Sequence, residues 1–336
     1  MDYTRLPRWR GFNLTEMFSV PDYCTDFVER DFAWMRAWGF DYVRLPMSYR
    51  CWTHDPLRWT EVDESRLRRV DQAVAWGRAY GLHVCINLHR APGWSVNTFQ
   101  TEPFDLWTDD TALDACAWQW RMLAERYRDV PTQALSFNFL NEPIHQTAVE
   151  LRRVYARLCA EVRAVSPDRL IVLDGPRWAR LPVPELADLH AAQSYHAYDP
   201  IQVCFWNWSQ LPDAAKWPRP TWPMDVVSED PFWHGRWDAG RLERQCLSSW
   251  DALAAAGVGV HVSEVACYKE TPHEVMLAWY RDFLRAWKRR GWGWALWNLR
   301  GDFGVVDSGR SDVAYEDLDG HRLDRRLLEL LRSDGA

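Results

Sequence analysis

The sequence has few features of a secreted or membrane-bound chain. No segment approaches 18 continuous apolar residues, which is about the length that a membrane-spanning helix needs. The N-terminal stretch MDYTRLPRWRGFNL lacks the apolar run of a signal peptide. These absences predict a cytoplasmic protein that does not bind membranes, unless a leader has been removed.

Excess positive charge is also missing. The formal net charge is -7 and the sequence pI is about 5.8, so nothing provides the basic surface that nucleic acid or an anionic membrane would attract. We therefore expect no nucleic-acid partner and a small, neutral ligand. The oligomeric state stays open.

Several motifs of other enzyme classes are absent. The eight cysteines are scattered, with no C-x-x-C and no Cys/His pair at zinc spacing. An even number would allow disulfides, but a large intracellular chain favours mostly buried thiols. No G-x-S-x-G elbow occurs, which argues against a Ser-His-Asp hydrolase, and no Gly-rich phosphate turn follows the first predicted strand.

What the sequence does contain is a repeated alternation of two kinds of segment. Short apolar or alternating runs, typical of strands, are each followed by a longer stretch with helical spacing. The strand-like runs are residues 9–13, 41–46, 82–89, 135–141, 170–175, 191–198, 258–264 and 292–299. The helical stretches are residues 26–39, 64–81, 111–129, 147–165, 241–257, 273–291 and 322–331.

This alternation predicts an α/β fold in which helices cover a parallel sheet. Eight strands in a chain of 336 residues fit a (β/α)8 barrel better than an open sheet. No linker divides the chain, so residues 1–336 are expected to form a single domain. The longest irregular region, about residues 199–237, follows the sixth strand and is rich in Pro and Trp. In a barrel it would lie over the active face.

Polar residues follow the strands of this predicted barrel at the end where active sites form. Two of them are glutamates, Glu142 after the fourth strand and Glu264 on the seventh. A pair of carboxylates across a narrow barrel suits glycosidic bond cleavage, in which one protonates the leaving oxygen and the other attacks the sugar or activates water. The other strand-end residues are Asn13, Arg44, His89, Asn141, His196, Tyr198 and Trp297.

The neighbours suggest a division of labour between the two glutamates. Arg44 and Tyr198 are expected to lower the pKa of Glu264, which would suit a nucleophile. Glu142, with less positive charge near it in the sequence, is expected to keep the raised pKa of an acid. Asn141 would bind a sugar hydroxyl, and Trp297 would offer a flat face to a sugar ring.

Each residue also has a simpler explanation. Asn141, Glu142 and Pro143 would equally suit the cap of the next helix. Glu264 and Arg44 would suit ordinary ion pairs, and His89 and His196 would suit satisfied core histidines. Core packing would also explain Trp297, and it is the preferred explanation for Trp292 and Trp294. The position of so many polar residues at the same end of successive strands favours a functional site.

In this order, the residues resemble glycoside hydrolase family 5, the cellulase and mannanase family of (β/α)8 barrels. The resemblance covers nearly the whole chain, from RGFNL at residues 10–14 to ALWNL at residues 295–299, and includes NEP at residues 141–143 and HAY at residues 196–198. It implies that Glu142 is the acid/base and Glu264 the nucleophile of a retaining reaction without metal or organic cofactor. Val262 and Ser263 precede Glu264, where many members have glycine.

The resemblance also implies a substrate class, β-1,4-linked manno- and gluco-oligosaccharides cut by an endo-acting enzyme. In HRAPGWSVN, Trp94 and Asn97 would reach the substrate, although a turn at Pro92-Gly93 explains the stretch equally well. Trp206 or Trp208 of the long sixth loop would stack on sugars.

Three other functions remain alternatives. An exo-acting β-mannosidase or β-glucosidase would use a loop to close one end of the sugar site. A non-catalytic sugar-binding barrel would not need both glutamates. A metal-dependent hydrolase would combine His89 and His196 with a carboxylate, but the first strand has no His-x-His pair.

Overall fold

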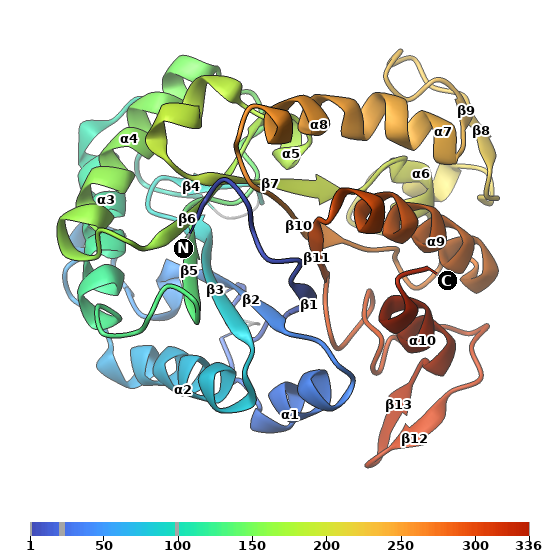
Figure 1. The fold of residues 1–336 in the computed structure, drawn as a ribbon, viewed down its shortest axis with the longest axis horizontal. Coiled ribbons are helices and arrows are strands. Elements are labelled where there is room, and N and C mark those ends of the chain that lie inside the picture. Colours follow the sequence, from blue (N-terminus) through green and yellow to red (C-terminus); the bar gives the residue numbers. More distant parts are fainter. Residues whose placement is uncertain (1, 20–23, 98–100, 336) are drawn as a thin grey trace.

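The computed structural model describes residues 2–19, 24–97 and 101–335, and a closed barrel of parallel strands forms its centre (Figure 1). Neighbours in the ring follow the chain order, and β1 closes it by pairing with both β2 and β11. Within the described residues, the barrel strands are β1 (Arg10–Asn13), β2 (Tyr42–Ser48), β3 (His83–Ala91), β5 (Leu135–Asn138), β6 (Leu170–Asp174), β7 (Ala192–Ala197), β10 (Val260–Val265) and β11 (Gly293–Leu296). The predicted (β/α)8 barrel is confirmed.

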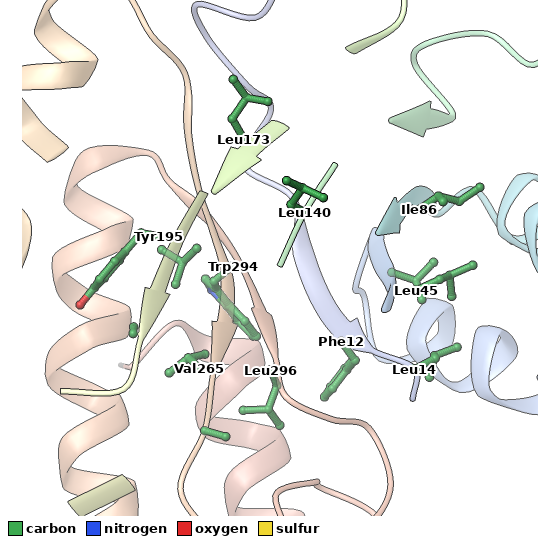
Figure 2. Packing of buried hydrophobic residues seen from close by; sticks show 14 of the residues in the cluster. Phe12, Leu14, Leu45, Ile86, Leu140, Leu173, Tyr195, Val265, Trp294 and Leu296 are labelled. Atoms are coloured by element: carbon green, nitrogen blue, oxygen red, sulfur yellow. The ribbon is translucent and has the colours of Figure 1, made fainter. Parts of the chain in front are cut away.

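Alternate residues of each strand enter two different environments. On β2, Tyr42 belongs to a small cluster with Trp9 and Cys85, whereas Val43 and Leu45 belong to the large apolar core. Because successive side chains of a strand point to opposite faces, one face lines the barrel interior and the other packs under the helices. Figure 2 shows part of the large core, with side chains such as Phe12, Leu45, Ile86, Leu173, Tyr195 and Trp294.

A glycine allows the first two strands to meet closely inside the barrel. A Cβ atom at Gly11 would lie 1.7 Å from the carbonyl oxygen of Tyr42 on β2. No side chain fits there, so the RGFN stretch needs glycine for close backbone approach.

Helices surround the barrel as the helical spacing predicts (Figure 1). The α2 helix ends at Gly81 with φ 66°, the left-handed C-terminal residue that the sequence predicted. The longer helices are α1 (Glu29–Ala37), α2 (Glu64–Tyr80), α3 (Asp110–Arg126), α4 (Ala148–Val165), α8 (Ser248–Ala255), α9 (His273–Arg290) and α10 (Arg325–Ser333). Among the described residues, no helix combines the length and apolar character needed to cross a membrane.

Two regions depart from the regular pattern. After β6 the structure has only α5 (Pro176–Ala179) and a 3₁₀ segment, Pro184–Leu189, so the expectation that every strand precedes a long helix is wrong there. Proline at positions 182 and 184 limits continuous helix in this stretch. The region expected to be irregular after β7 contains α6 (Ile201–Cys204) and a hairpin of β8 (Met224–Val226) and β9 (Gly235–Trp237). The helix of this repeat begins with α7 (Ala239–Arg241) and a π-helical turn, Leu242–Leu247.

The remaining elements are short. They are the strands β4 (Trp94–Ser95), β12 (Glu316–Leu318) and β13 (His321–Leu323), and the 3₁₀ segments Tyr49–Cys51, Pro56–Arg58 and Ala214–Lys216. The cysteines form no disulfide among the described residues, and all except Cys24 are buried, in agreement with the prediction of buried thiols.

Candidate active site

The predicted strand-end residues converge at one end of the barrel. Arg44 lies on β2, His89 on β3, His196 on β7 and Glu264 on β10. Tyr198 and Trp297 follow β7 and β11, and Asn141 and Glu142 lie three and four residues beyond the end of β5. Parallel strands bring these positions to the same edge of the sheet, although they are far apart in the sequence.

Arg44 is the centre of the hydrogen-bond network at this end. Its guanidinium is fully buried and donates to Glu264 Oε1 at 2.6 Å. It also donates to the side-chain oxygens of Asn13 at 3.0 Å, Asn138 at 2.9 Å and Asn141 at 2.8 Å. A planar guanidinium with five donors can satisfy all of these acceptors at once, which a lysine cannot do.

Glu264 receives a hydrogen bond on each of its oxygens. Arg44 donates to Oε1, and the Tyr198 hydroxyl donates to Oε2 at 2.8 Å. The expected contacts are therefore present, but the expected lowering of the pKa of Glu264 is wrong. Burial raises this pKa, and the charge of Arg44, the neighbouring His196 and the Tyr198 hydrogen bond only partly oppose the effect.

Glu142 lies beside Glu264 in a different setting. Its Oε1 is 2.8 Å from Nδ1 of His196, and its side chain is 12% exposed against 4% for Glu264. Burial raises the pKa of Glu142 to about 8, and the positive charge of Arg180 is the largest opposing influence. The direction agrees with the sequence expectation, although the main cause is desolvation.

The backbone shows that Asn141, Glu142 and Pro143 do not cap α4. The residue that caps this helix is Thr147, whose side chain accepts from the backbone N–H of Glu150 while the Glu150 carboxylate accepts from the N–H of Thr147. This capping box satisfies the start of the helix on its own. Asn141 and Glu142 are therefore available for the site.

Three buried residues of the network, Asp174, Asn138 and Asn87, escaped the sequence analysis. Asp174, at the end of β6, accepts from Asn138 Nδ2 at 2.8 Å and from the backbone N–H of Glu142 at 3.0 Å. Asn138 in turn accepts from Arg44 and from Asn87. The strand-end rule that selected the other residues would have found Asp174, because it is the last polar residue of the fifth strand-like run, next to Gly175. Asn138 has no such signal, since it lies within the LSFNFLN run.

Aromatic rings surround the two carboxylates. The ring of His89 lies 5.5 Å from Trp297 in a stacked arrangement, and Phe18 contacts both rings. Burial lowers the pKa of His89 well below its ordinary value, so this histidine is neutral. On the Glu264 side, Phe205 stacks between Tyr198 and Trp208, with centroid distances of 5.1 Å to each.

The four loop residues predicted to touch substrate differ in their surroundings. The Trp94 indole N–H donates to the carbonyl oxygen of Asn141 at 2.7 Å, which ties its loop to the site. Trp208 belongs to the aromatic row just described. Trp206 donates to the carbonyl oxygen of Trp217 and so packs its own loop. Asn97 contacts Ser95 through its backbone, and its side-chain nitrogen is buried without a protein partner.

A short left-handed turn stands beside Glu142. Arg177, Trp178 and Ala179 all have positive φ angles, between 55° and 59°. Residues other than glycine rarely adopt this backbone conformation. Backbone N–H groups of this turn donate to the carbonyl oxygens of Ile144 and Pro143 at 2.9 and 3.0 Å. The turn therefore joins the loop after β6 to the loop that carries Glu142.

The carboxylates and His196 form the one group among the described residues with the spacing of a metal site. Glu142, His196 and Glu264 offer ligand atoms within 4.8 Å of one another. However, Arg44 and Tyr198 already donate to the two oxygens of Glu264. Because both oxygens of Glu264 already accept hydrogen bonds and Arg44 supplies the compensating positive charge, we assign no metal to this group. The arrangement instead suits acid, base and nucleophilic chemistry by paired carboxylates.

Comparisons with known proteins agree with this geometry. The family model described as Cellulase (glycosyl hydrolase family 5) matches residues 4–302. Endoglucanase C of Acetivibrio thermocellus is 22% identical over 320 residues, which cover 90% of this chain and 92% of that protein. A crystal structure of a glycoside hydrolase covers 98% of this chain and 100% of its own, with a TM-score of 0.90 and 30% sequence identity.

Endoglucanase Cel5A of Thermotoga maritima has the same fold. Its complex with cellobiose gives a TM-score of 0.75 at 19% identity and covers 98% of each chain. Its complex with mannotriose also gives 0.75, at 20% identity, and covers 96% of this chain and 97% of that one.

Proposed function

Because this chain belongs to glycoside hydrolase family 5, and is therefore a glycoside hydrolase, we propose that it cleaves β-1,4-linked gluco- and manno-oligosaccharides internally and with retention of configuration. The observation that carries the proposal is the carboxylate pair. Oxygens of Glu142 and Glu264 lie within 4.8 Å, which is close to the separation of about 5–5.5 Å in retaining glycosidases and shorter than the roughly 6.5–9.5 Å of inverting ones.

In the first step Glu142 acts as the acid and Glu264 as the nucleophile. A Glu264 oxygen forms a bond to the anomeric carbon while the bond from that carbon to the glycosidic oxygen breaks. The proton of Glu142 passes to the departing oxygen. Arg44 and Tyr198 orient the attacking carboxylate, because they hold both of its oxygens.

In the second step Glu142, now ionised, acts as the base. It removes a proton from a water molecule, whose oxygen attacks the anomeric carbon and displaces Glu264. The sugar leaves with its original configuration and Glu142 regains its proton. Asn141, whose oxygen is held by Arg44, would bind a hydroxyl beside the cleaved bond.

The relatives support both sugars as test substrates. Endoglucanase C is named for glucan cleavage, and Cel5A of Thermotoga maritima has been crystallised with cellobiose and with mannotriose. Exo action on the same sugars remains the alternative, and the size of the products separates the two.

The experiment is product analysis on cellohexaose and mannohexaose, for the wild type, Glu142→Gln and Glu264→Gln. We expect internal cuts, release of the β-anomer in the first minutes by NMR, and a large loss of activity in both variants. A single sugar released at every turnover would contradict endo action. A wild type that binds both oligomers without cutting either would contradict the proposal.

We also propose that residues 1–336 form a single catalytic domain. One apolar core runs from Phe12 to Leu331, which supports this assignment. The cytoplasmic location stays a prediction from the sequence, and cell fractionation would test it.

A further inference from the structure

Asp174 is a buried carboxylate beside the proposed acid/base. Its side chain is fully buried at the end of β6. One oxygen accepts from Asn138 Nδ2 at 2.8 Å, and the other accepts from the backbone N–H of Glu142 at 3.0 Å. Both oxygens of Asp174 therefore act as hydrogen-bond acceptors.

The same carboxylate faces His196, which in turn faces Glu142. Oδ2 of Asp174 is 3.4 Å from Nε2 of His196, and Nδ1 on the opposite side of the ring is 2.8 Å from Oε1 of Glu142. Burial lowers the pKa of His196, so the ring is neutral and carries one N–H. The nitrogen that carries this hydrogen determines whether Glu142 must be protonated to form a hydrogen bond with the ring.

No hydrogen bond joins Asp174 to Nε2, but a carboxylate at 3.4 Å favours the tautomer with hydrogen on that nitrogen, because a lone pair facing it would be repelled. Oε2 of Glu264, 3.6 Å from Nδ1, acts in the opposite direction, but it is farther away and already accepts from Tyr198. Nδ1 is then an acceptor. A hydrogen bond across the 2.8 Å to Glu142 consequently requires a proton on the Glu142 carboxyl group. The opposite tautomer would donate from Nδ1 and stabilise ionised Glu142.

We propose that Asp174 is a positioning residue that keeps Glu142 protonated by fixing the tautomer of His196. The inference rests on the proposed role of Glu142 as the acid/base, and it assigns a task to a residue with no contact to the sugar. Asp174 acts on Glu142 in a second way, through the backbone. Glu142 has φ 51°, a strained value for a residue with a side chain, and Asp174 holds its N–H in that conformation.

Some of the charges around Glu142 raise its pKa and others lower it. The negative charge of Asp174 raises the pKa of Glu142, in addition to burial, while Arg180 and Arg44 lower it. The titratable and charged groups around it are Arg44 on β2, Asp174 on β6, Arg180 after α5, His196 on β7, Tyr198 after β7 and Glu264 on β10. Asp174 is the member of this set that contacts both the backbone of Glu142 and its histidine partner.

The test compares Asp174→Asn with Tyr155→Phe. The asparagine has nearly the same shape but no charge. With its NH₂ group at the position of Oδ2 it can donate to Nε2 of His196, which reverses the tautomer, and it no longer accepts from the N–H of Glu142. Tyr155 donates to the backbone carbonyl of Asp174 at 2.7 Å, so Tyr155→Phe perturbs the same place without changing the carboxylate. Two substrates are used, cellotetraose and 2,4-dinitrophenyl β-cellobioside, whose leaving group needs no proton.

For Asp174→Asn we expect the alkaline limb of kcat/KM to move to lower pH by about one unit. Activity on cellotetraose should fall about 100-fold, and the formation of the glycosyl-enzyme from the dinitrophenyl substrate should change by less than about threefold. Tyr155→Phe should lose stability and keep the pH profile. Equal losses on both substrates with an unmoved alkaline limb would reduce Asp174 to a structural role and overturn the proposal.

A second measurement works on the wild type and does not depend on activity. Nitrogen-15 NMR of labelled histidine distinguishes the two neutral tautomers, and the His196 signals are assigned by their loss in His196→Gln. We expect the Nε2–H tautomer at neutral pH. The Nδ1–H tautomer would overturn the inference, even if Asp174→Asn does not fold. A wild type that cleaves neither substrate but shows the Nε2–H tautomer would refute the proposed function and leave the assigned tautomer standing.

Discussion

Glu142 and Glu264 lie side by side, yet the protein surrounds them with opposite kinds of partner. Glu264 receives hydrogen bonds from Arg44 and Tyr198 on its two oxygens. Glu142 meets a neutral histidine backed by a third carboxylate, Asp174. Burial raises the pKa of both glutamates. Burial alone therefore cannot separate an acid from a nucleophile, and the difference comes from the hydrogen-bond donors.

Removing Glu264, the glutamate that accepts from Arg44 and Tyr198, should have the largest effect on activity. We expect Glu264→Ala to lower kcat by about 10⁴-fold or more, since no group remains to attack the anomeric carbon. Formate should restore part of the turnover of 2,4-dinitrophenyl β-cellobioside, because Arg44 and Tyr198 would hold the anion in the vacated space. Initial rates with and without formate measure this. Glu270→Ala, at an exposed position, is the control, and undiminished activity of Glu264→Ala would contradict the assignment.

Replacing Arg44 by lysine, which weakens the hydrogen bonding to Glu264 but keeps the positive charge, should reduce activity less. Arg44→Lys keeps a cation beside Glu264 but loses the fork that reaches three asparagines. We expect kcat/KM to fall about 10²–10³-fold and the free energy of unfolding to fall by about 2–4 kcal/mol. Denaturant unfolding and steady-state kinetics measure the two effects.

A buried arginine elsewhere provides the control for this variant. Arg169 donates to the carbonyl oxygens of Tyr127, Val130 and Leu135, away from both glutamates. Arg169→Lys should therefore lose stability with kcat/KM unchanged. If Arg169→Lys loses as much activity as Arg44→Lys, the effect of Arg44 is on folding alone.

The pH profile tests the protonation states of the two glutamates directly. The reaction needs Glu142 protonated, so kcat/KM should fall about tenfold per unit as the pH rises above about 8. It also needs Glu264 ionised. Because the pKa of Glu264 is raised from its ordinary value of 4.5, the acid limb should lie above pH 4.5. On the dinitrophenyl substrate, whose leaving group needs no proton, formation of the glycosyl-enzyme should lack this alkaline limb. A limb that persists there would mean that another group titrates.

The smallest effect is expected in the aromatic row. Trp208→Ala should weaken the binding of long oligomers by about 0.5–1.5 kcal/mol, which corresponds to a rise in KM of several-fold. Trp206→Ala should reduce stability instead, because its indole N–H holds the carbonyl oxygen of Trp217. KM values for cellopentaose and for a short aryl cellobioside distinguish the two. An unchanged KM in Trp208→Ala would remove this residue from the substrate site.

The sequence was enough to predict the barrel because the strand and helix periods are strong. All eight strand-like runs became barrel strands, and position along the strands was enough to expect His196 and Glu264 near each other. Arg44 lies four residues before the end of β2, and its long side chain reaches Glu264 from there. Contacts between distant segments were harder. The 3.4 Å approach of Asp174 to His196 depends on how neighbouring strands are staggered, and no local pattern encodes it.

The same limit explains the error on the pKa of Glu264. Sequence position indicated a cation and a hydroxyl nearby, and both are there. It did not indicate how deeply the barrel end is buried, and desolvation is the larger influence on this carboxyl group. Loop geometry was equally hidden. Nothing in the residues 177–179 suggested three successive left-handed conformations.

The joint between that left-handed turn and the Glu142 loop has a consequence for evolution. The two loops are joined by backbone groups, from the N–H groups of Arg177 and Trp178 to the carbonyl oxygens of Ile144 and Pro143. Main-chain hydrogen bonds do not depend on side-chain identity. The Trp178 side chain, which is 39% exposed, can therefore vary among descendants of this enzyme without loosening the wall that supports Glu142.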